Sequence, residues 1–128
     1  MIMKNVRKFW LCSHCGNIIS YLKDVGVGVS CCGETMQEII PNTTDAATEK
    51  HIPAVVREGN LLKVTVGSIP HPMTPEHYIA WIVVADGDRT YRVALAKTDT
   101  PSTEFAIAGP EVTVYAYCNL HGLWAAEF

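Results

Sequence analysis

The 128-residue chain has no run of roughly 18 or more apolar residues, the length that a membrane-crossing helix needs. Its first residues, MIMKNVRKFWLC, also lack the apolar segment and the small-residue cleavage site of a secretory signal peptide. We therefore expect a cytoplasmic protein with no membrane partner. In that reducing compartment, the five cysteines are expected to be metal ligands or reactive thiols rather than disulfide partners.

The chain also lacks a broad positive field, because its formal net charge is −3. Its few basic residues are not interleaved with aromatic residues in any patch, so nucleic acid is not an expected partner. Residues 1–36 carry four basic and two acidic residues, a net of +2, whereas residues 37–128 carry six and eleven, a net of −5. Together with the clustering of cysteines and the linker-like stretch QEIIPNTTDA at residues 37–46, this uneven charge predicts two domains, 1–37 and 38–128.

No stretch of the chain has a convincing helical period, and no internal repeat or low-complexity tract is present. Short runs rich in Val, Ile, Tyr and Trp take their place, and in residues 62–66 apolar and polar side chains alternate with the period of a strand. Residues 58–60 (EGN) and 86–88 (DGD) are typical of hairpin turns. The pattern predicts an all-β fold, an antiparallel β-sandwich of immunoglobulin-like type. Its seven expected strands are AVV, LLKVTVG, YIAWIVVA, RTYRVALA, EFAI, EVTVYAYC and LWAAEF.

The N-terminal segment is too short to bury a core of its own, and domains of this size usually need a metal or disulfides to fold. It contains Cys12-x-x-Cys15 and, after fifteen intervening residues, the adjacent pair Cys31 and Cys32. Four thiolates at this spacing predict a tetrahedral all-cysteine site for zinc or iron, with a vicinal disulfide as the alternative. Because consecutive side chains point to opposite sides of an extended chain, a local turn helped by Gly33 must bring both sulfurs to one metal.

Four of the five histidines lie in loop-like segments of the C-terminal part. They are His51 in ATEKHIP, His71 and His77 in SIPHPMTPEHYI, and His121, which follows Cys118 in CNLHG. A lone histidine is more often a surface residue than a ligand, but four with a thiolate at the loop edges of one small sandwich indicate a shared metal. Four imidazoles and one sulfur suit a redox iron or copper, and five ligands leave the sixth octahedral position of iron free.

These motifs resemble, in order and approximate spacing, those of the two-iron superoxide reductases, the desulfoferrodoxins. The matching segments are CSHCGNI, CCGETM, EKHIP, PHPMTPEHYI and CNLHGLW. The resemblance implies a desulforedoxin-like domain at 1–37, an immunoglobulin-like catalytic domain at 38–128, and two iron ions as cofactors. One iron would be bound by Cys12, Cys15, Cys31 and Cys32, and the other by His51, His71, His77 and His121, with Cys118 as the axial ligand.

By the same resemblance, Glu49 of the EKH motif ligates the oxidised iron, and Lys50 assists the binding and protonation of superoxide. The implied activity is the one-electron reduction of superoxide to hydrogen peroxide, with an electron donor such as rubredoxin and a homodimeric assembly. Two other functions stay open, a non-catalytic iron electron carrier and a zinc-binding interaction module. The sequence favours the enzyme, because a pure carrier gains nothing from an open coordination position beside a lysine.

Formal charges agree with this interpretation. Ferrous iron with four neutral imidazoles and one thiolate carries about +1 and attracts superoxide, although the whole chain is acidic. Iron with four thiolates carries about −2 or −1, which suits an electron store and repels superoxide. Lys50 adds to the local positive field. Met73, Trp81 and Trp124 are expected to be core or pocket-wall residues without a chemical role.

Overall fold

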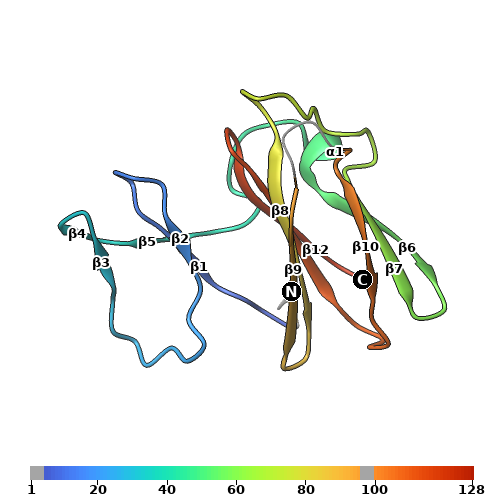
Figure 1. Cartoon of the computed structure of the whole chain (residues 1–128), viewed down its shortest axis with the longest axis horizontal. Helices are drawn as coiled ribbons and strands as arrows, with labels where there is room; N and C mark the ends of the chain where they lie inside the picture. The colour runs from blue at the N-terminus through green and yellow to red at the C-terminus, as the bar shows by residue number, and fades with distance from the viewer. Residues whose placement is uncertain (1–4, 96–99) are drawn as a thin grey trace. The chain divides into compact units, whose positions relative to one another are not determined.

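The computed structural model describes residues 5–95 and 100–128 (Figure 1). The described residues form two compact units, one of residues 7–40 and the other of residues 5–6, 41–95 and 100–128. No helix within the described ranges is long and apolar enough to cross a membrane. Residues 1–4 of the predicted N-terminal domain and Ala96 of the expected strand RTYRVALA lie outside the described residues.

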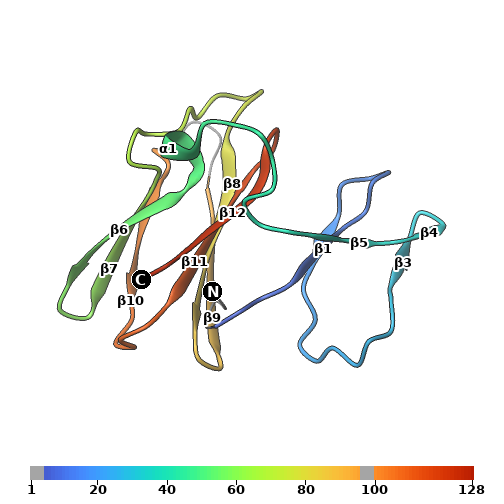
Figure 2. The ribbon, with the colours of Figure 1, turned by 180° about the vertical axis from the view of Figure 1, so that it is seen from behind.

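The larger unit is an antiparallel sandwich of two sheets, which confirms the predicted fold class (Figures 1 and 2). Its seven strands coincide with the seven runs expected from the sequence: β6 (Pro53–Glu58), β7 (Leu61–Val66), β8 (Ile79–Asp86), β9 (Arg89–Ala94), β10 (Ser102–Ala106), β11 (Thr113–Cys118) and β12 (Gly122–Glu127). One sheet has the order β10-β7-β6, and the other has the order β12-β11-β8-β9.

Alternating burial explains why these runs form strands. In β7, Leu62, Val64 and Val66 are at most 1% exposed, whereas the residues between them are half-buried. They join the inward side chains of the four-stranded sheet in one core, and burying each side chain contributes roughly 1.5–3 kcal/mol. Gly59 and Gly87 both have a φ of 60° in the turns of the β6–β7 and β8–β9 hairpins, at the two positions where the sequence predicts turns.

Three chain segments meet at one end of this sandwich. The one-turn helix α1 (Thr48–His51) leads into β6, whose first residue pairs with the last residue of β7. The segment of residues 67–78 connects β7 to β8, and the turn between β11 and β12 lies beside the start of β8 (Figure 1). The four histidines expected to bind the second metal lie in these three segments, and Cys118 is the last residue of β11, where the turn begins.

The smaller unit has short strands and few buried side chains. Strands β1 (Phe9–Leu11), β2 (Ile18–Ile19) and β5 (Gln37–Ile39) form one sheet in the order β2-β1-β5, and β3 (Ser30–Cys31) pairs with β4 (Glu34–Thr35). Its buried hydrophobic residues are Phe9, Cys12 and Met36. Such a small core agrees with a unit that depends on a metal for its stability.

Candidate metal centres

Five donor side chains converge at the end of the sandwich, and we call them the histidine–cysteine site. Their donor atoms all lie within 4.8 Å of one another. The structure thus brings together every residue that the sequence predicted for this metal and adds no carboxylate of the described residues to the group. The members are His51, His71, His77, Cys118 and His121.

The four imidazole rings occupy the corners of a square. The ring centroids of neighbours are 4.6 Å (His51–His71), 4.5 Å (His71–His77), 5.0 Å (His77–His121) and 4.9 Å (His51–His121) apart. Across the square, His51 and His77 are 6.4 Å apart, longer than each side as a diagonal must be. Neighbouring rings are nearly perpendicular, at 75° to 89°. Four ligands in one plane around a single ion require this arrangement.

Backbone carbonyls select the nitrogen that two of the rings turn inward. His51 Nδ1 donates to Ala47 O and His71 Nδ1 donates to Pro72 O, each at 2.7 Å, because a carbonyl oxygen can only accept. The two Nε2 atoms that remain face each other at 3.1 Å. Two nitrogens bound at right angles to one ion, each about 2.1 Å from it, are separated by about 3 Å, so this spacing fits a shared metal.

The other donors fit a metal as well. His77 Nε2 is buried and has no hydrogen-bond partner within the described part of the chain, an arrangement that proteins rarely tolerate unless the atom binds something else. His121 turns Nδ1 inward, 3.1 Å from His51 Nε2 and 3.7 Å from Cys118 Sγ. Cys118 is fully buried, and its sulfur accepts the His121 backbone N–H at 3.4 Å.

Burial sets the protonation of these donors. Desolvation lowers the pKa of His71 to about 4 and lowers the pKa of His51 and His77, so these imidazoles are neutral near pH 7, the form that binds a metal. Desolvation raises the pKa of the Cys118 thiol, while backbone N–H groups oppose that shift. A metal cation would stabilise the thiolate that burial disfavours.

The EKH motif forms the single turn of α1 and packs against the backbone that follows β7. Glu49 O accepts the Ile69 N–H at 3.0 Å and the Ser68 hydroxyl at 3.3 Å. The prediction that His51 lies in a loop is wrong, because His51 is the last residue of α1. The helix could not be recognised in the sequence, since four residues are too few to show a helical period. The turn directs His51 into the core, where it is 3% exposed.

The side chains of Glu49 and Lys50 are exposed, and neither carries a donor atom of the histidine–cysteine site. The charge of Lys50 nevertheless affects two of the rings. Desolvation and neighbouring histidines are the larger causes of the lowered pKa of His51 and of His77, and the Lys50 charge lowers both pKa values further. The ammonium group therefore lies within electrostatic range of the site. Glu49 has the opposite effect on the pKa of His51.

Gly67 allows α1 to approach. A Cβ at this position would lie 2.6 Å from Glu49 O and 2.8 Å from Ile52 O, closer than real contacts allow. We expect Gly67→Ala to displace α1, lower the iron content of the histidine–cysteine site and cost about 1–3 kcal/mol of stability. Thermal unfolding and metal analysis of the purified variant measure both effects.

Gly59→Ala is the matched control for Gly67→Ala. Its backbone is left-handed and a Cβ there meets nothing within 4 Å, so the variant should cost about 1 kcal/mol through strain alone. It should keep its iron. An equal loss of iron in both variants, or full iron content in Gly67→Ala, would contradict the close packing of α1 on Gly67.

Trp124 is buried beside the site, as the prediction of a core or pocket-wall residue implies, but its support of the ligands was not predicted from the sequence. Its indole stacks on the His51 ring, with centroids 4.8 Å apart and planes at 26°, and its Nε1 donates to His121 O at 3.1 Å. It therefore supports two neighbouring corners of the square. Its position three residues after His121 is the signal that could have suggested this role.

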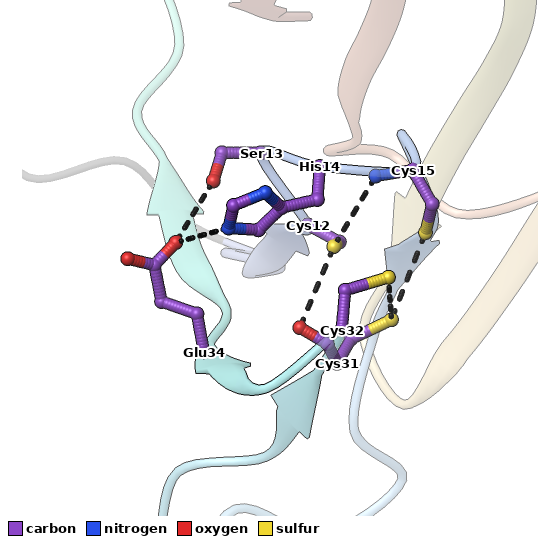
Figure 3. Close-up of polar contacts among 7 residues, drawn as sticks. All are labelled: Cys12, Ser13, His14, Cys15, Cys31, Cys32 and Glu34. Carbon is purple, nitrogen blue, oxygen red and sulfur yellow. Dashed lines mark hydrogen bonds and ion pairs between the residues drawn. The ribbon is translucent and has the colours of Figure 1, made fainter.

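The second group, the four-cysteine site, lies in the smaller unit (Figure 3). Its four sulfurs lie within 4.8 Å of one another. The adjacent Cys31 and Cys32 are free thiols with sulfurs 4.0 Å apart, which rules out the vicinal disulfide because a disulfide bond is about 2.05 Å long. Cys32 has a φ of 52° and Gly33 a φ of 77°, and this left-handed turn aims both sulfurs at one point as expected. The other members are Cys12 and Cys15.

Hydrogen bonds and neighbouring thiols shift the pKa of Cys12 and that of Cys32 in opposite directions. The pKa of Cys12 falls to about 6, chiefly through the hydrogen bond from the Cys15 backbone N–H. The pKa of Cys32 rises to about 12, first through its side-chain contact with Cys15. One thiolate therefore forms readily, and a bound cation is needed to deprotonate all four.

His14 lies inside the Cys12–Cys15 loop but takes no part in the four-cysteine site. Its Nε2 lies 2.9 Å from a Glu34 carboxylate oxygen, and the same oxygen accepts the Ser13 hydroxyl at 3.1 Å (Figure 3). All three side chains are exposed. The omission of His14 from the predicted ligands agrees with this outward pairing.

Known proteins resemble the chain along nearly its whole length. Residues 43–127 match the family model described as desulfoferrodoxin. The chain is 45% identical to the desulfoferrodoxin of Nitratidesulfovibrio vulgaris, covering 98% of this chain and 99% of that protein. It is 43% identical to the superoxide reductase of Pyrococcus abyssi over 62% of this chain and 85% of that protein. The crystal structure of the superoxide reductase from Treponema pallidum has a TM-score of 0.78 at 36% identity, covering 94% of this chain and 98% of that chain.

Proposed function

Because the chain belongs to the desulfoferrodoxin family, we propose that it is a superoxide reductase, which converts superoxide to hydrogen peroxide by one-electron reduction. Its two donor groups match the two iron cofactors of a two-iron desulfoferrodoxin. The observation that carries the proposal is the square of four imidazoles with one buried cysteine sulfur beside it. An electron carrier or a structural zinc module has no need of such a donor set.

Each residue of the histidine–cysteine site has a distinct task in this proposal. When bound there, ferrous iron supplies the electron for the reduction. The four histidines hold the metal as neutral ligands, so only the Cys118 thiolate offsets its charge and the site stays attractive to an anion. The protein core keeps water from Cys118, which is fully buried.

Lys50 and Glu49 have opposite tasks. The exposed Lys50 ammonium extends the positive field beyond the rings, draws superoxide toward them and helps to supply protons for the product. Glu49 is proposed to ligate the oxidised iron. Since its carboxylate lies outside the donor group, this task requires the side chain to turn toward the histidines.

The four-cysteine site is proposed as an electron-transfer centre supplied by a donor such as rubredoxin. With four thiolates around its metal, it repels superoxide and leaves that reaction to the other site. We propose residues 1–37 as the desulforedoxin-like domain, residues 38–128 as the catalytic domain, and a homodimer as the assembly. A cytoplasmic location is proposed because the five cysteines are free thiols, the state that a reducing compartment maintains.

Metal analysis and pulse radiolysis test the proposal together. The purified chain should contain two irons, and the reduced chain should consume superoxide with one hydrogen peroxide formed for each electron that it gives up. Two zinc ions per chain would contradict both iron functions. Two irons without rapid consumption of superoxide would favour the electron carrier.

Changing Lys50 and Glu49 should alter the encounter with superoxide in opposite directions. Lys50→Ala should slow the bimolecular reaction by up to roughly tenfold, the lower end of electrostatic steering, because a positive charge near the rings is lost. Glu49→Ala should react as fast or faster, since a negative charge is lost, and its ferric absorption spectrum should change. Pulse radiolysis of the reduced variants at several salt concentrations measures these rates.

Lys63→Ala provides the control for charge. Lys63 is a half-buried lysine on β7 whose ammonium group pairs with the exposed Glu58 at 3.3 Å, so its removal changes the net charge equally without touching the site. The reaction of this variant should match that of the wild type. Added salt should slow the wild type more than Lys50→Ala. Equal slowing by Lys50→Ala and Glu49→Ala would contradict the opposite tasks.

A further inference from the structure

The pairing of β8 with β11 changes register beside the histidine–cysteine site. Tyr117 pairs with Trp81, but the next residue, Cys118, pairs with Ile79, so Ala80 is an extra residue on β8. Such bulges re-aim side chains next to active sites. The backbone ladder then continues past Cys118, where Asn119 N donates to Tyr78 O at 3.2 Å.

The side chain of Asn119 extends this pairing beyond the end of the strand. Its Oδ1 accepts the Tyr78 N–H at 2.8 Å, and its Nδ2 donates to Glu76 O at 2.9 Å. Glu76 and Tyr78 are the two neighbours of His77 in the chain. One asparagine therefore holds the backbone on both sides of that histidine.

His77 depends on its backbone more than His51 and His71 do. Those two rings are oriented by N–H bonds to carbonyls, whereas the buried Nε2 of His77 has no hydrogen-bond partner within the described part of the chain. Thr74 closes the turn from inside, since Thr74 N donates to His77 O at 2.9 Å and Thr74 Oγ1 accepts the His77 N–H at 3.1 Å. Asn119 ties that turn to the segment that carries Cys118 and His121.

We propose that Asn119 is a positioning residue that fixes His77 at its corner of the square by holding the peptide groups on both sides of this ligand. The inference rests on the proposed iron site. Loss of a residue that orients a ligand in this way typically lowers metal affinity about 10- to 100-fold.

The chain contains a matched control in Asn5, at the opposite end of the sandwich. Its Oδ1 accepts the Gly87 N–H at 3.0 Å, and its Nδ2 donates to Glu111 O at 2.9 Å. These are the same two kinds of side-chain bond, but Gly87 follows β8 and Glu111 precedes β11, whereas the histidine–cysteine site lies where β8 begins and β11 ends. Because Asn5 has a φ of 55°, Asn5→Gly removes the side-chain bonds without adding backbone strain.

The experiment compares the iron-loaded full chain of the wild type with Asn119→Ala and Asn5→Gly. Chelator competition measures iron affinity at each site, since the four-cysteine iron has its own absorption spectrum. Asn119→Ala should bind iron about 10- to 100-fold more weakly at the histidine–cysteine site, shift its sulfur-to-iron band and leave the four-cysteine site unchanged. Asn5→Gly should lose stability without either effect.

Asn119→Ser, which keeps a hydroxyl near Tyr78, is measured in the same way if Asn119→Ala does not fold. Wild-type affinity and an unshifted band in the Asn119 variant, or an equal loss of affinity in Asn5→Gly, would overturn the inference. A wild-type chain that binds only one iron would instead contradict the proposed iron site. The two failures are therefore distinguishable.

Discussion

Cys118→Ser should abolish the sulfur-to-iron absorption band of the oxidised histidine–cysteine site and lower the rate of superoxide reduction by at least about 100-fold. The estimate follows because losing only an outer-shell partner costs about 10- to 100-fold, and Cys118 is a proposed ligand. Serine is nearly the same size as cysteine, so the fully buried position is filled, but its hydroxyl does not ionise near pH 7. Absorption spectroscopy and pulse radiolysis of the reduced variant measure the two losses.

The four-cysteine site serves as the internal control for Cys118→Ser. It lies in the other unit of the chain, so its spectrum and its iron should be unchanged. A second control, Ser13→Ala, removes an exposed hydroxyl beside that site and should leave both spectra unchanged. If Cys118→Ser keeps iron at the histidine–cysteine site together with wild-type activity, Cys118 is not the sulfur ligand that the activity requires.

The sandwich could be predicted from the sequence because each of its strands carries its own signal. In β7, the alternation of Leu62, Val64 and Val66 with polar residues is local, and so is the turn chemistry of Gly59 and Gly87. The residues of the two metal sites could also be predicted from the sequence. Cysteine and histidine are rare and chemically specific, so their positions could be matched to ligands without knowing the fold.

The remaining features depend on contacts that no local pattern contains. Helix α1 is too short to show a period, and it is held by Gly67 and Ile69 from another segment. The register change at Ala80 depends on the partner strand. The inward nitrogen of His71 is set by a carbonyl in the folded loop. Composition and spacing specify which residues bind, whereas tertiary contacts specify how those residues are aimed.

In the four-cysteine site, too, the sequence predicts which residues bind but not the full conformation that aims them. The sequence indicated that a turn near Gly33 must bring two adjacent sulfurs together, and the structure has that turn. It did not indicate that Cys32 itself adopts a left-handed backbone, which is uncommon for a residue other than glycine. A metal bound by Cys31 and Cys32 would favour this conformation, because binding both sulfurs to one ion requires the turn.

Cys12→Ser should therefore release the iron of the four-cysteine site and unfold most of residues 7–40. Cys12 is the buried cysteine of the four and the one whose pKa is lowered to about 6, so it is the first thiolate available to a metal. A structural metal contributes about 10–16 kcal/mol in small zinc domains, far more than the few buried side chains of this unit supply. Metal analysis, limited proteolysis and amide hydrogen exchange measure the loss.

The sandwich should stay folded in Cys12→Ser, because its hydrophobic core contains no residue of the smaller unit. Amides of β7, β8 and β11 should keep their protection from exchange, and the reduced variant should still react with superoxide at a rate close to that of the wild type. Ser13→Ala, next in the chain and exposed, should keep its iron and the protection of the smaller unit. Unfolding of the whole chain by Cys12→Ser would contradict the independence of the sandwich. Continued protection of residues 7–40 without iron would contradict the structural role of the metal, because a unit with so few buried side chains would then be stable on its own.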